Sequence, residues 1–326
     1  MSAGGARRDG ATPDFDYPGT RGAAGTQNTY FSRCRDARRA NTVAPMNTHS
    51  AGATVVTGAS SGIGLHTAIA LARAGYQVVA TIRRPESRSA VAARAERAQV
   101  RFDTRIMDVT SDYSVTSGIE EIVADYGAVH ALINNAGAGH LGTLEQDSLA
   151  EIRAVCELNF FGVVRVSKAL LPHLRASGGR LITVTSVGGV LGQPFNDAYC
   201  AAKFAVEGMM ESLAPVAAAL GVAVSVIEPG AVHTEFVTNA GNVADRLDAA
   251  GPYRDLLQRY LATVEGAFAA GQSPVEVADV VLDVLRAPEP AFRYQTAAAA
   301  TRFAATKLAD VTGAAVQQLT ASWLIG

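Results

Sequence analysis

The chain has 326 residues, of which 48% are hydrophobic and 18% charged, so it is long enough for one large domain with a sizeable core. A formal net charge of −2 gives no electrostatic argument for nucleic acid, and no apolar run reaches the roughly 18 residues of a membrane helix, so we predict neither partner. Cys34, Cys156 and Cys200 lack metal-ligand spacing, so we expect no metal site, no disulfide framework and a reducing, cytoplasmic location.

Residues 1–45 differ in composition from the rest of the chain. They are rich in Gly, Arg, Asp and Thr and contain few large apolar residues, so they cannot bury enough surface to offset the entropy of ordering. We therefore predict a disordered extension. Its lack of an apolar run argues against a secretory signal, and its four aspartates argue against a mitochondrial presequence. Two interpretations stay open: a genuine flexible tail, or a wrongly assigned start with Met46 as the alternative first residue.

From residue 53 onward, short apolar strands alternate with amphipathic helices. We expect strands at 53–58, 76–83, 101–108, 130–137, 179–186, 222–230 and 291–296. Near-continuous apolar strands of this kind are covered on both faces, which predicts an α/β fold built on a Rossmann-type, doubly wound parallel sheet of about seven strands. We predict one catalytic domain at 46–296, with a helical substrate lid at about 235–273, and a C-terminal helical tail at 297–326.

The predicted lid contains the segment YRDLLQRYLATVEGAFA, which favours one or two helices. Helical spacing puts Leu256, Tyr260, Val264 and Phe268 on one apolar stripe. Such a stripe usually packs in a core, but here it could also close over an apolar substrate and exclude water. Both interpretations can hold together.

The stretch TGASSGIG, residues 57–64, lies where the first strand ends and the first helix begins. In a dinucleotide site, Gly58 would allow the tight turn, Gly62 the approach of the pyrophosphate and Gly64 close helix–strand packing. The free amides of the helix N-terminus would face the phosphates. The spacing G-x-x-x-G-x-G differs from the commoner dinucleotide-binding fingerprint. The prediction of a dinucleotide site therefore depends on the position of the motif between a strand and a helix.

The end of the second strand, ATIRRP, bears on the choice of nicotinamide cofactor. Enzymes that prefer NAD place an acidic residue there to hold the ribose 2′-hydroxyl, whereas this chain has Ile82 followed by Arg83. An arginine can hold a 2′-phosphate through charge-assisted hydrogen bonds. We therefore predict NADP(H) in preference to NAD(H). The alternative is that Arg83 and Arg84 are solvated loop charges.

Tyr199 and Lys203 lie four residues apart on a predicted helix, so their side chains project from the same face. A phenol beside an ammonium group suits proton transfer near neutral pH better than it suits apolar packing. Taken alone, the pair would most often be a coincidence.

Several motifs in one order make this sequence resemble the short-chain dehydrogenase/reductase family. They are TGxxxGxG at 57–64, Asp108, NNAG at 134–137, Asn159, Ser186, YxxxK at 199–203 and PG at 229–230. The resemblance covers residues 53 to about 236. Residues 186–214 are also similar to the type 1 17β-hydroxysteroid dehydrogenases and the photoreceptor retinol dehydrogenases, whereas residues 237–273 cannot be aligned with that branch.

The resemblance implies a role for each matching residue. Tyr199 would be the general acid or base, and Lys203 would lower its pKa from about 10 and hold the nicotinamide ribose. Ser186 would bind the substrate oxygen, and Asn159 would anchor a water that links Lys203 to solvent. The implied substrate contacts are Ser186, Tyr199 and His233, the last equally well explained as a loop histidine. The implied cofactor contacts are Gly58, Ser60, Ser61, Gly62, Ile63, Gly64, Arg83, Asp108, Val109, Asn134, Asn135, Ala136, Gly137, Tyr199, Lys203, Pro229, Gly230, Val232 and Thr234.

The expected function is that of an NADP(H)-dependent oxidoreductase that interconverts an alcohol and its ketone or aldehyde. The resemblance implies an apolar substrate, such as a steroid, a retinoid or a fatty chain, and a homodimer or homotetramer. One alternative is a reductase of acyl or small polar carbonyls. Another is a non-catalytic NADP-binding redox sensor, which would have no use for an intact set of Ser186, Tyr199 and Lys203.

Overall fold

The computed structural model of the protein describes residues 52–234, 243–310 and 314–322. The expected disordered extension at 1–45 and the first part of the expected lid lie outside the described residues. The strands are β1 (Ala53–Val56), β2 (Gln77–Ile82), β3 (Asp103–Ile106), β4 (Val129–Asn134), β5 (Arg180–Val184), β6 (Ala223–Glu228) and β7 (Arg293–Gln295). They form one parallel sheet in the order β3-β2-β1-β4-β5-β6-β7. The predicted seven-stranded parallel sheet is confirmed.

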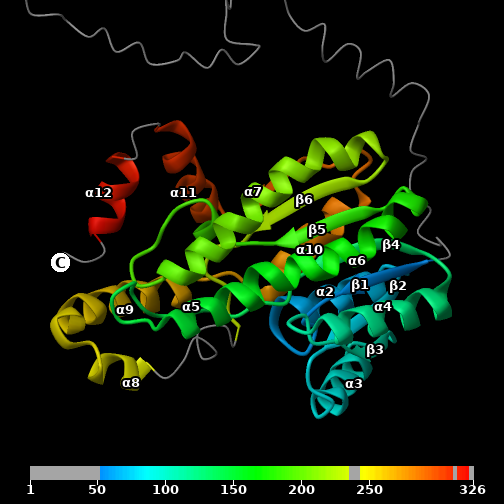
Figure 1. Cartoon of the computed structure of the whole chain (residues 1–326), viewed down its shortest axis with the longest axis horizontal. Helices are drawn as coiled ribbons and strands as arrows, with labels where there is room; N and C mark the ends of the chain where they lie inside the picture. The colour runs from blue at the N-terminus through cyan, green and yellow to red at the C-terminus, as the bar shows by residue number, and fades with distance from the viewer. Residues whose placement is uncertain (1–51, 235–242, 311–313, 323–326) are drawn as a thin grey trace, which may run out of the picture. The chain divides into compact units, whose positions relative to one another are not determined.

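Helices cover both faces of this sheet (Figure 1). One face carries α2 (Gly62–Arg73), α3 (Ser87–Arg97) and α10 (Pro274–Arg286), and the other carries α4 (Asp112–Tyr126), α6 (Gly162–Ser177) and α7 (Asp197–Ala219). Successive strand residues point to opposite faces, so Val55 packs in the core under α6 while Val56 packs in the core under α2. The strands are therefore apolar on both sides, as the sequence predicts.

The strand order reverses beside β1, because β2 and β3 lie on one side of it and β4 to β7 on the other. In open α/β sheets, ligands bind outside the carboxyl ends of the strands at such a reversal. Figure 1 shows α8 (Val243–Asp248) and α9 (Arg254–Ala269) at the end of the sheet toward which β5 and β6 point. The shorter elements near this end are α5 (Leu149–Cys156), η1 (Glu157–Phe161), η2 (Val187–Gly189) and η4 (Gly251–Tyr253).

The packed stripe of α9 differs from the prediction at Leu256 and Phe268, neither of which belongs to the apolar cluster around Tyr260 and Val264. Leu257 and Tyr260 are buried against Leu141 and Phe195, whereas Leu256 is 37% exposed. A strict step of four residues drifts around a helix with 3.6 residues per turn, so the packed stripe alternates steps of three and four. The placement of Leu256 and Phe268 on that stripe was therefore wrong.

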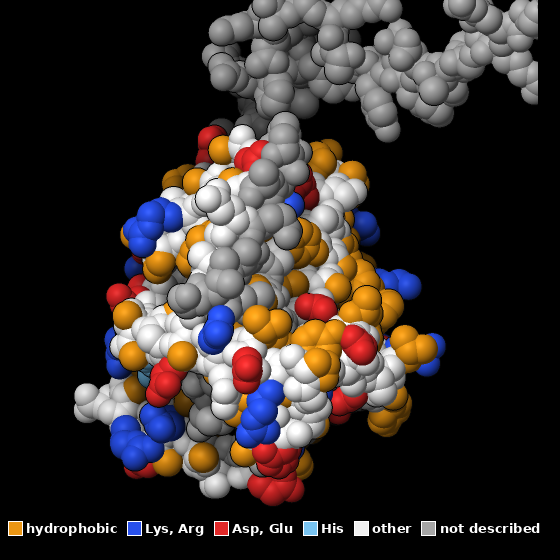
Figure 2. Space-filling model, turned by 90° about the vertical axis from the view of Figure 1, so that its left-hand side faces the viewer, with side chains coloured by type: hydrophobic (Ala, Val, Ile, Leu, Met, Phe, Trp, Pro, Cys, Tyr) orange, Lys and Arg blue, Asp and Glu red, His pale blue; other side chains and the backbone are white. Residues whose placement is uncertain are grey.

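The described part of the C-terminal tail forms α11 (Ala298–Ala309) and α12 (Ala314–Ser322). Figure 2, which looks onto the lid end of the described chain, shows acidic, basic and hydrophobic side chains interspersed. None of the helices in the described ranges is long and apolar enough to cross a membrane.

Candidate active site

The glycine loop after β1 packs so closely against the turn after β4 that two of its positions accept only glycine. A Cβ on Gly58, whose φ is +65°, would lie 2.7 Å from Ala136 Cα. A Cβ on Gly64 would lie 2.3 Å from Asn135 Nδ2. The loop and the NNAG turn therefore form one unit at the reversal of the strand order.

Thr57 joins these two segments. Its hydroxyl oxygen accepts hydrogen bonds from the backbone amides of Asn135 and Ala136, at 3.0 and 3.1 Å. The Asn135 side chain donates in return to the carbonyl oxygens of Thr57 and Gly58. Thr57 was not among the predicted site residues, although it begins the glycine motif. Asn134, in contrast, donates to Ser167 inside the core.

The start of α2 fits a pyrophosphate group. Ser61 is the N-cap of this helix and makes no side-chain capping hydrogen bond, so the first backbone amides keep their capacity to donate. Gly62 has a φ of +54°, and a Cβ there would lie 3.3 Å from Thr234 Cγ2. Thr234, predicted from the PG motif, therefore lies beside the glycine loop. Ser60 is exposed and Ile63 is partly buried.

The residues predicted to meet the adenosine half lie at the ends of β2 and β3. Arg83 is exposed directly after the buried Ile82. Burial raises the pKa of Asp108, but hydrogen bonds from Thr110 and the charges of Arg83 and Arg165 bring it below its usual value. Arg83 and Asp108 are therefore electrostatic neighbours, as a shared adenosine site requires. Val109 is buried against Gly162.

Ser186 and Tyr199 meet at the carboxyl end of β5. Ser186 is the N-cap of η2, and its Oγ accepts a hydrogen bond from the amide of Gly188 at 3.0 Å. A Cβ on Gly188 would lie 3.3 Å from Tyr199 Cε1 and 3.4 Å from Ser186 Oγ. Burial raises the pKa of Tyr199 above its usual value, and a side-chain hydrogen bond with Ser186 opposes this rise. The structure thus brings the two predicted residues together.

Lys203 lies one turn further along α7 and is 4% exposed. Its Nζ donates to the carbonyl oxygen of Val184 at 3.2 Å and lies 5.8 Å from the centroid of the Tyr199 ring. Burial lowers the pKa of this ammonium to about 8, and the charge of Glu207 acts in the opposite direction. A cation is therefore held next to a phenol whose own burial disfavours ionisation.

Asn159 lies in the π-helical turn η1, a rare conformation that often marks functional sites. Its Oδ1 accepts from the amide of Ala138 at 3.2 Å, and its Nδ2 donates to the carbonyl of Val155 at 3.1 Å. A Cβ on Gly137 would lie 2.8 Å from Asn159 Oδ1 and 3.6 Å from Lys203 Nζ. Asn159 and Lys203 therefore meet across the NNAG turn.

The residues after β6 complete this end of the sheet. The carbonyl of Pro229 accepts from the amide of Val187 at 3.0 Å, which ties the PG motif to the loop that begins at Ser186. Gly230 faces Ala300 of α11, and Val232 is buried. The exposed His233 donates its backbone amide to Gln272. In this loop, Pro229 and Val232 are therefore buried, whereas the side chain of His233 is exposed.

Comparison with known proteins shows the family of this chain. A sequence model described as short chain dehydrogenase matches residues 53–244. The chain belongs to the short-chain dehydrogenase family. Human 17-beta-hydroxysteroid dehydrogenase type 1 is 41% identical over 254 residues, covering 74% of this chain and 76% of that protein. Bovine retinol dehydrogenase 8 is 39% identical over 272 residues, covering 79% and 86%.

A solved structure agrees with this assignment. A variant of the actinorhodin polyketide ketoreductase with NADPH superposes on this short-chain dehydrogenase with a TM-score of 0.65 and 29% identity, over 77% of this chain and 97% of that one. The chain is thus an oxidoreductase for alcohol and ketone substrates that uses a nicotinamide cofactor. Among the described residues, no group of three or more His, Cys, Asp or Glu side chains could hold a metal ion.

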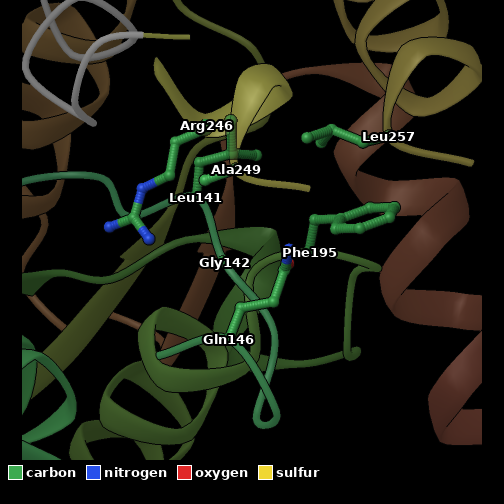
Figure 3. Close-up of a pocket in the computed structure, with 7 residues that line it drawn as sticks. All are labelled: Leu141, Gly142, Gln146, Phe195, Arg246, Ala249 and Leu257. Atoms are coloured by element: carbon green, nitrogen blue, oxygen red, sulfur yellow. The ribbon is translucent and has the colours of Figure 1, made fainter. Parts of the chain in front are cut away.

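A cavity of about 160 Å³ lies between the α8–α9 segment of this short-chain dehydrogenase, part of the predicted lid, and the loops that follow β4 and β5 (Figure 3). Its lining residues are Leu141, Gly142, Gln146, Phe195, Arg246, Ala249 and Leu257. Phe195 lies four residues before Tyr199, so this cavity adjoins the start of α7. Sequence reasoning missed these residues because they come from three separated segments.

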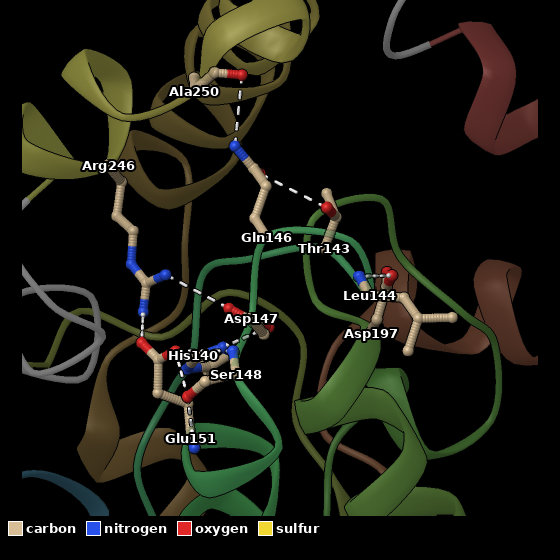
Figure 4. A network of polar contacts seen from close by, with 10 residues as sticks. All are labelled: His140, Thr143, Leu144, Gln146, Asp147, Ser148, Glu151, Asp197, Arg246 and Ala250. Carbon is tan, nitrogen blue, oxygen red and sulfur yellow. Dashed lines mark hydrogen bonds and ion pairs between the residues drawn. The ribbon is translucent and has the colours of Figure 1, made fainter.

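Polar contacts join α8 and the nearby Ala250 of the short-chain dehydrogenase to the segment after β4 and to α5 (Figure 4). Arg246 of α8 pairs with Asp147 at 3.2 Å and with Glu151 at 3.1 Å, while Asp147 also bonds to His140 at 2.7 Å. Gln146 donates to the carbonyl of Ala250 at 3.2 Å. We call the contacts of Arg246 with Asp147 and Glu151 the lid latch.

Proposed function

We propose that the protein is an NADP(H)-dependent oxidoreductase that interconverts an apolar alcohol and its ketone or aldehyde, with Tyr199 as the general acid and base. The observation that carries this proposal is the meeting of Tyr199, Ser186 and Lys203 at the carboxyl end of β5. A buried phenol with a hydrogen-bonded serine on one side and a cation on the other is suited to proton exchange with a substrate oxygen.

When bound, the nicotinamide supplies the hydride to the carbonyl carbon or accepts it from the alcohol carbon. In reduction, Tyr199 donates its hydroxyl proton to the substrate oxygen, and in oxidation its phenolate takes that proton back. Ser186 donates a hydrogen bond to the same oxygen and stabilises the negative charge that develops there. The Lys203 ammonium, 5.8 Å from the centroid of the Tyr199 ring, would favour the phenolate through its charge, against the effect of burial.

We assign the supply of protons to a water held near Asn159. Both polar atoms of the Asn159 side chain already have backbone partners, so the anchor for this water would be its main-chain carbonyl. The π-helical turn displaces the normal hydrogen-bond pattern of a helix at this point. Protons would pass from this water to Lys203, whose Nζ lies near Gly137, as the Asn159 side chain does.

For the cofactor, we propose NADP(H) over NAD(H). Arg83 is exposed at the end of β2 and close enough to Asp108 to act on its pKa, so its guanidinium could take a 2′-phosphate. Ile82 provides no carboxylate that would repel this phosphate. The glycine loop, the NNAG turn, Pro229, Gly230, Val232 and Thr234 would hold the rest of the molecule.

For the substrate, we propose a bulky apolar molecule of the steroid, retinoid or fatty-chain type. Leu141, Phe195 and Leu257 give the cavity an apolar wall. Arg246 is the one cation among the described residues that line it, and it is already paired with two carboxylates. An acyl carrier phosphate would need a free cation there. The named activities of the two relatives, on a hydroxysteroid and on retinol, support the same class.

We also propose a homo-oligomer formed through the helices that follow β4 and β5. Phe161 of η1, Phe204 and Val216 of α7 and Leu220 directly after α7 are large apolar side chains that are exposed in the described chain. Exposed apolar side chains on these helices support an interface there. A cytoplasmic location and a role for His233 at the far end of the substrate stay predictions.

The test is consumption of reduced cofactor by the purified protein with ketosteroids, retinals, long-chain aldehydes and small polar ketones. We expect turnover of one apolar class with NADPH and weaker turnover with NADH. Turnover confined to small polar ketones would contradict the substrate class. Tight binding of NADPH without turnover of any carbonyl would contradict the enzymatic proposal and favour a redox sensor.

A further inference from the structure

The buried face of α7 carries a third ionisable residue in line with Tyr199 and Lys203. Glu207 lies one turn beyond Lys203 and is 4% exposed. A Cβ on Gly189 would lie 3.0 Å from Glu207 Cγ and 3.3 Å from Lys203 Cβ, so the backbone of η2 covers both side chains. A buried carboxylate is costly unless other groups compensate its charge.

Two strands and the residue after β5 supply the groups that surround Glu207. The hydroxyl of Thr185, directly after β5, donates to Glu207 Oε1 at 2.5 Å, and Arg293 Nη1 of β7 lies 2.8 Å from Glu207 Oε2. The same Nη1 lies 2.6 Å from Oε1 of Glu228, the fully buried last residue of β6. Arg293 Nη2 pairs with Glu211, which is 65% exposed.

The charges of this cluster do not balance without Lys203. The buried carboxylates of Glu207 and Glu228 share the single guanidinium of Arg293, which leaves one surplus negative charge. The other cation at hand is Lys203, on the same face of α7. No charged side chain comes from η2, and the residue after β5 is the neutral Thr185.

The pKa values of Glu207 and Lys203 reflect this arrangement of charges. Burial raises the pKa of Glu207 to about 7, with Thr185, Arg293 and Lys203 lowering it and Glu228 raising it. The negative charge of Glu207 in turn opposes the effect of burial on Lys203. If the charge of Glu207 were removed, Lys203 would lose its proton at a lower pH, and Tyr199 would lose the cation that favours its phenolate.

We propose that Glu207 is a positioning residue that keeps Lys203 protonated and, through Lys203, sets the acidity of Tyr199. This inference rests on the proposed function, because it assigns Tyr199 the proton transfer. The competing explanation is purely structural: Arg293 would use Glu207 only to fasten the edge strand β7 to α7.

The experiment compares Glu207→Gln, which removes the charge, with Glu207→Asp, which keeps it. Glu211→Gln is the matched control, because Glu211 also lies on α7 and also pairs with Arg293 but is exposed. Two quantities are followed across pH: kcat for oxidation of an apolar alcohol at saturating NADP⁺, and the ionisation of Tyr199 from phenolate absorbance after subtraction of the Tyr199→Phe spectrum. Melting temperatures are measured alongside.

For Glu207→Gln, we expect the rising limb of kcat and the ionisation of Tyr199 to move to higher pH by about one unit. At neutral pH this corresponds to about a tenfold loss of kcat, with the KM for NADP⁺ changed less than about twofold. The pH profile and the Tyr199 ionisation of Glu207→Asp should lie closer to those of wild type. Those of Glu211→Gln should match wild type. A lower melting temperature of Glu207→Gln with an unmoved pH profile and unmoved Tyr199 ionisation would overturn the proposal.

A second variant keeps the test decisive if Glu207→Gln does not fold. Glu228→Gln removes the surplus charge while leaving an amide that can still bond to Gln295, the present partner of Glu228. Because Glu228 raises the pKa of Glu207, its removal leaves Glu207 charged to lower pH, so we expect a smaller shift in the opposite direction. No shift, or a shift to higher pH, in folded Glu228→Gln would overturn the inference. A wild type that oxidises no alcohol would contradict the proposed function instead, while the ionisation of Tyr199 would still test Glu207.

Discussion

Burial and proton transfer make opposite demands on Tyr199. Burial excludes water from the reaction but raises the pKa of the phenol, so the phenolate needs local stabilisation. In the proposed mechanism, the Ser186 hydroxyl provides it by a hydrogen bond and the Lys203 ammonium by its charge. Each of these side chains has a backbone partner, Gly188 for Ser186 and Val184 for Lys203. The proposed catalysis therefore depends on a few contacts at the carboxyl end of β5 and the start of α7.

Arg83 should decide between the two nicotinamide cofactors. In Arg83→Gln, we expect the KM for NADPH to rise about tenfold or more, because the charge-assisted bonds to the 2′-phosphate are lost. The KM for NADH should change little. Steady-state kinetics with both cofactors checks this, with Arg84→Gln as the control, since Arg84 is the exposed neighbour. An equal rise for both cofactors would show that Arg83 does not select the phosphate.

At the scale of elements, α8 and α9 pack on the rest of the described domain through polar contacts and an apolar cluster. The apolar cluster includes Leu141, Phe195, Leu257 and Tyr260, and Asn196 donates a hydrogen bond to the Tyr260 hydroxyl at 2.6 Å. The lid latch adds Arg246, which reaches the almost fully buried Asp147. The position of the lid over the cavity thus depends on the segment between β4 and α5.

Removal of the lid latch should loosen the substrate site without touching the proton-transfer groups. In Arg246→Met, we expect the KM for the apolar substrate to rise several-fold and the free energy of unfolding to fall by about 2 kcal/mol, because buried Asp147 loses a charged partner. Arg254→Met is the control: its pair with Asp248 is exposed, so its loss should change stability by less than about 0.5 kcal/mol. Denaturant titration and initial rates measure both effects. Equal behaviour of the two variants would contradict the role of the latch.

On the scale of the whole molecule, the sequence predicts the sheet well and the lid poorly. Strands such as β1 and β5 are apolar runs bounded by Gly or polar motifs, and for these the local pattern and the global burial agree. Leu256 was misplaced because an exposed helix has several apolar stripes of similar strength, and only the partner surface of Leu141 and Phe195 selects one.

The site shows the same division. Tyr199, Lys203 and Ser186 could be found because one helix and one preceding loop carry them at fixed spacing. Glu207 continues that spacing, so a stripe of Tyr, Lys and Glu four residues apart was a usable signal. Its partner Arg293 was not predictable, since the contact depends on β7 pairing beside β6. Long-range contacts of this kind are fixed by topology and not by local pattern.

Lys203 should lower the stability of the fold in a pH-dependent way. Its pKa is about 8 in the folded protein against a usual 10.5, so the unfolded chain binds the proton more tightly and the buried ammonium destabilises the fold. This penalty, about 3 kcal/mol, is complete below about pH 8 and fades as pH rises toward 10.5.

We therefore expect Lys203→Met to be more stable than wild type at pH 7 by roughly 1 to 3 kcal/mol. The lower values apply if the loss of the Lys203 charge destabilises the buried carboxylate of Glu207. The difference should narrow by about pH 10. Denaturant unfolding at the two pH values measures it, with the exposed Lys168→Met as the control. A variant less stable than wild type at pH 7 would show that Lys203 stabilises the fold.

The most direct test of the whole account is the kcat of Tyr199→Phe for NADPH-dependent reduction of an apolar ketone. Loss of one hydroxyl that donates the proton should lower kcat by about a thousandfold, while the dissociation constant for NADPH stays within about threefold of wild type. Tyr126→Phe is the control, because it also removes a phenol hydroxyl. Tyr126 is the last residue of α4, and its hydroxyl bonds to Asp103, outside the proposed site. A Tyr199→Phe variant that reduces the ketone at a rate near that of wild type would contradict the assignment of Tyr199 as the proton donor.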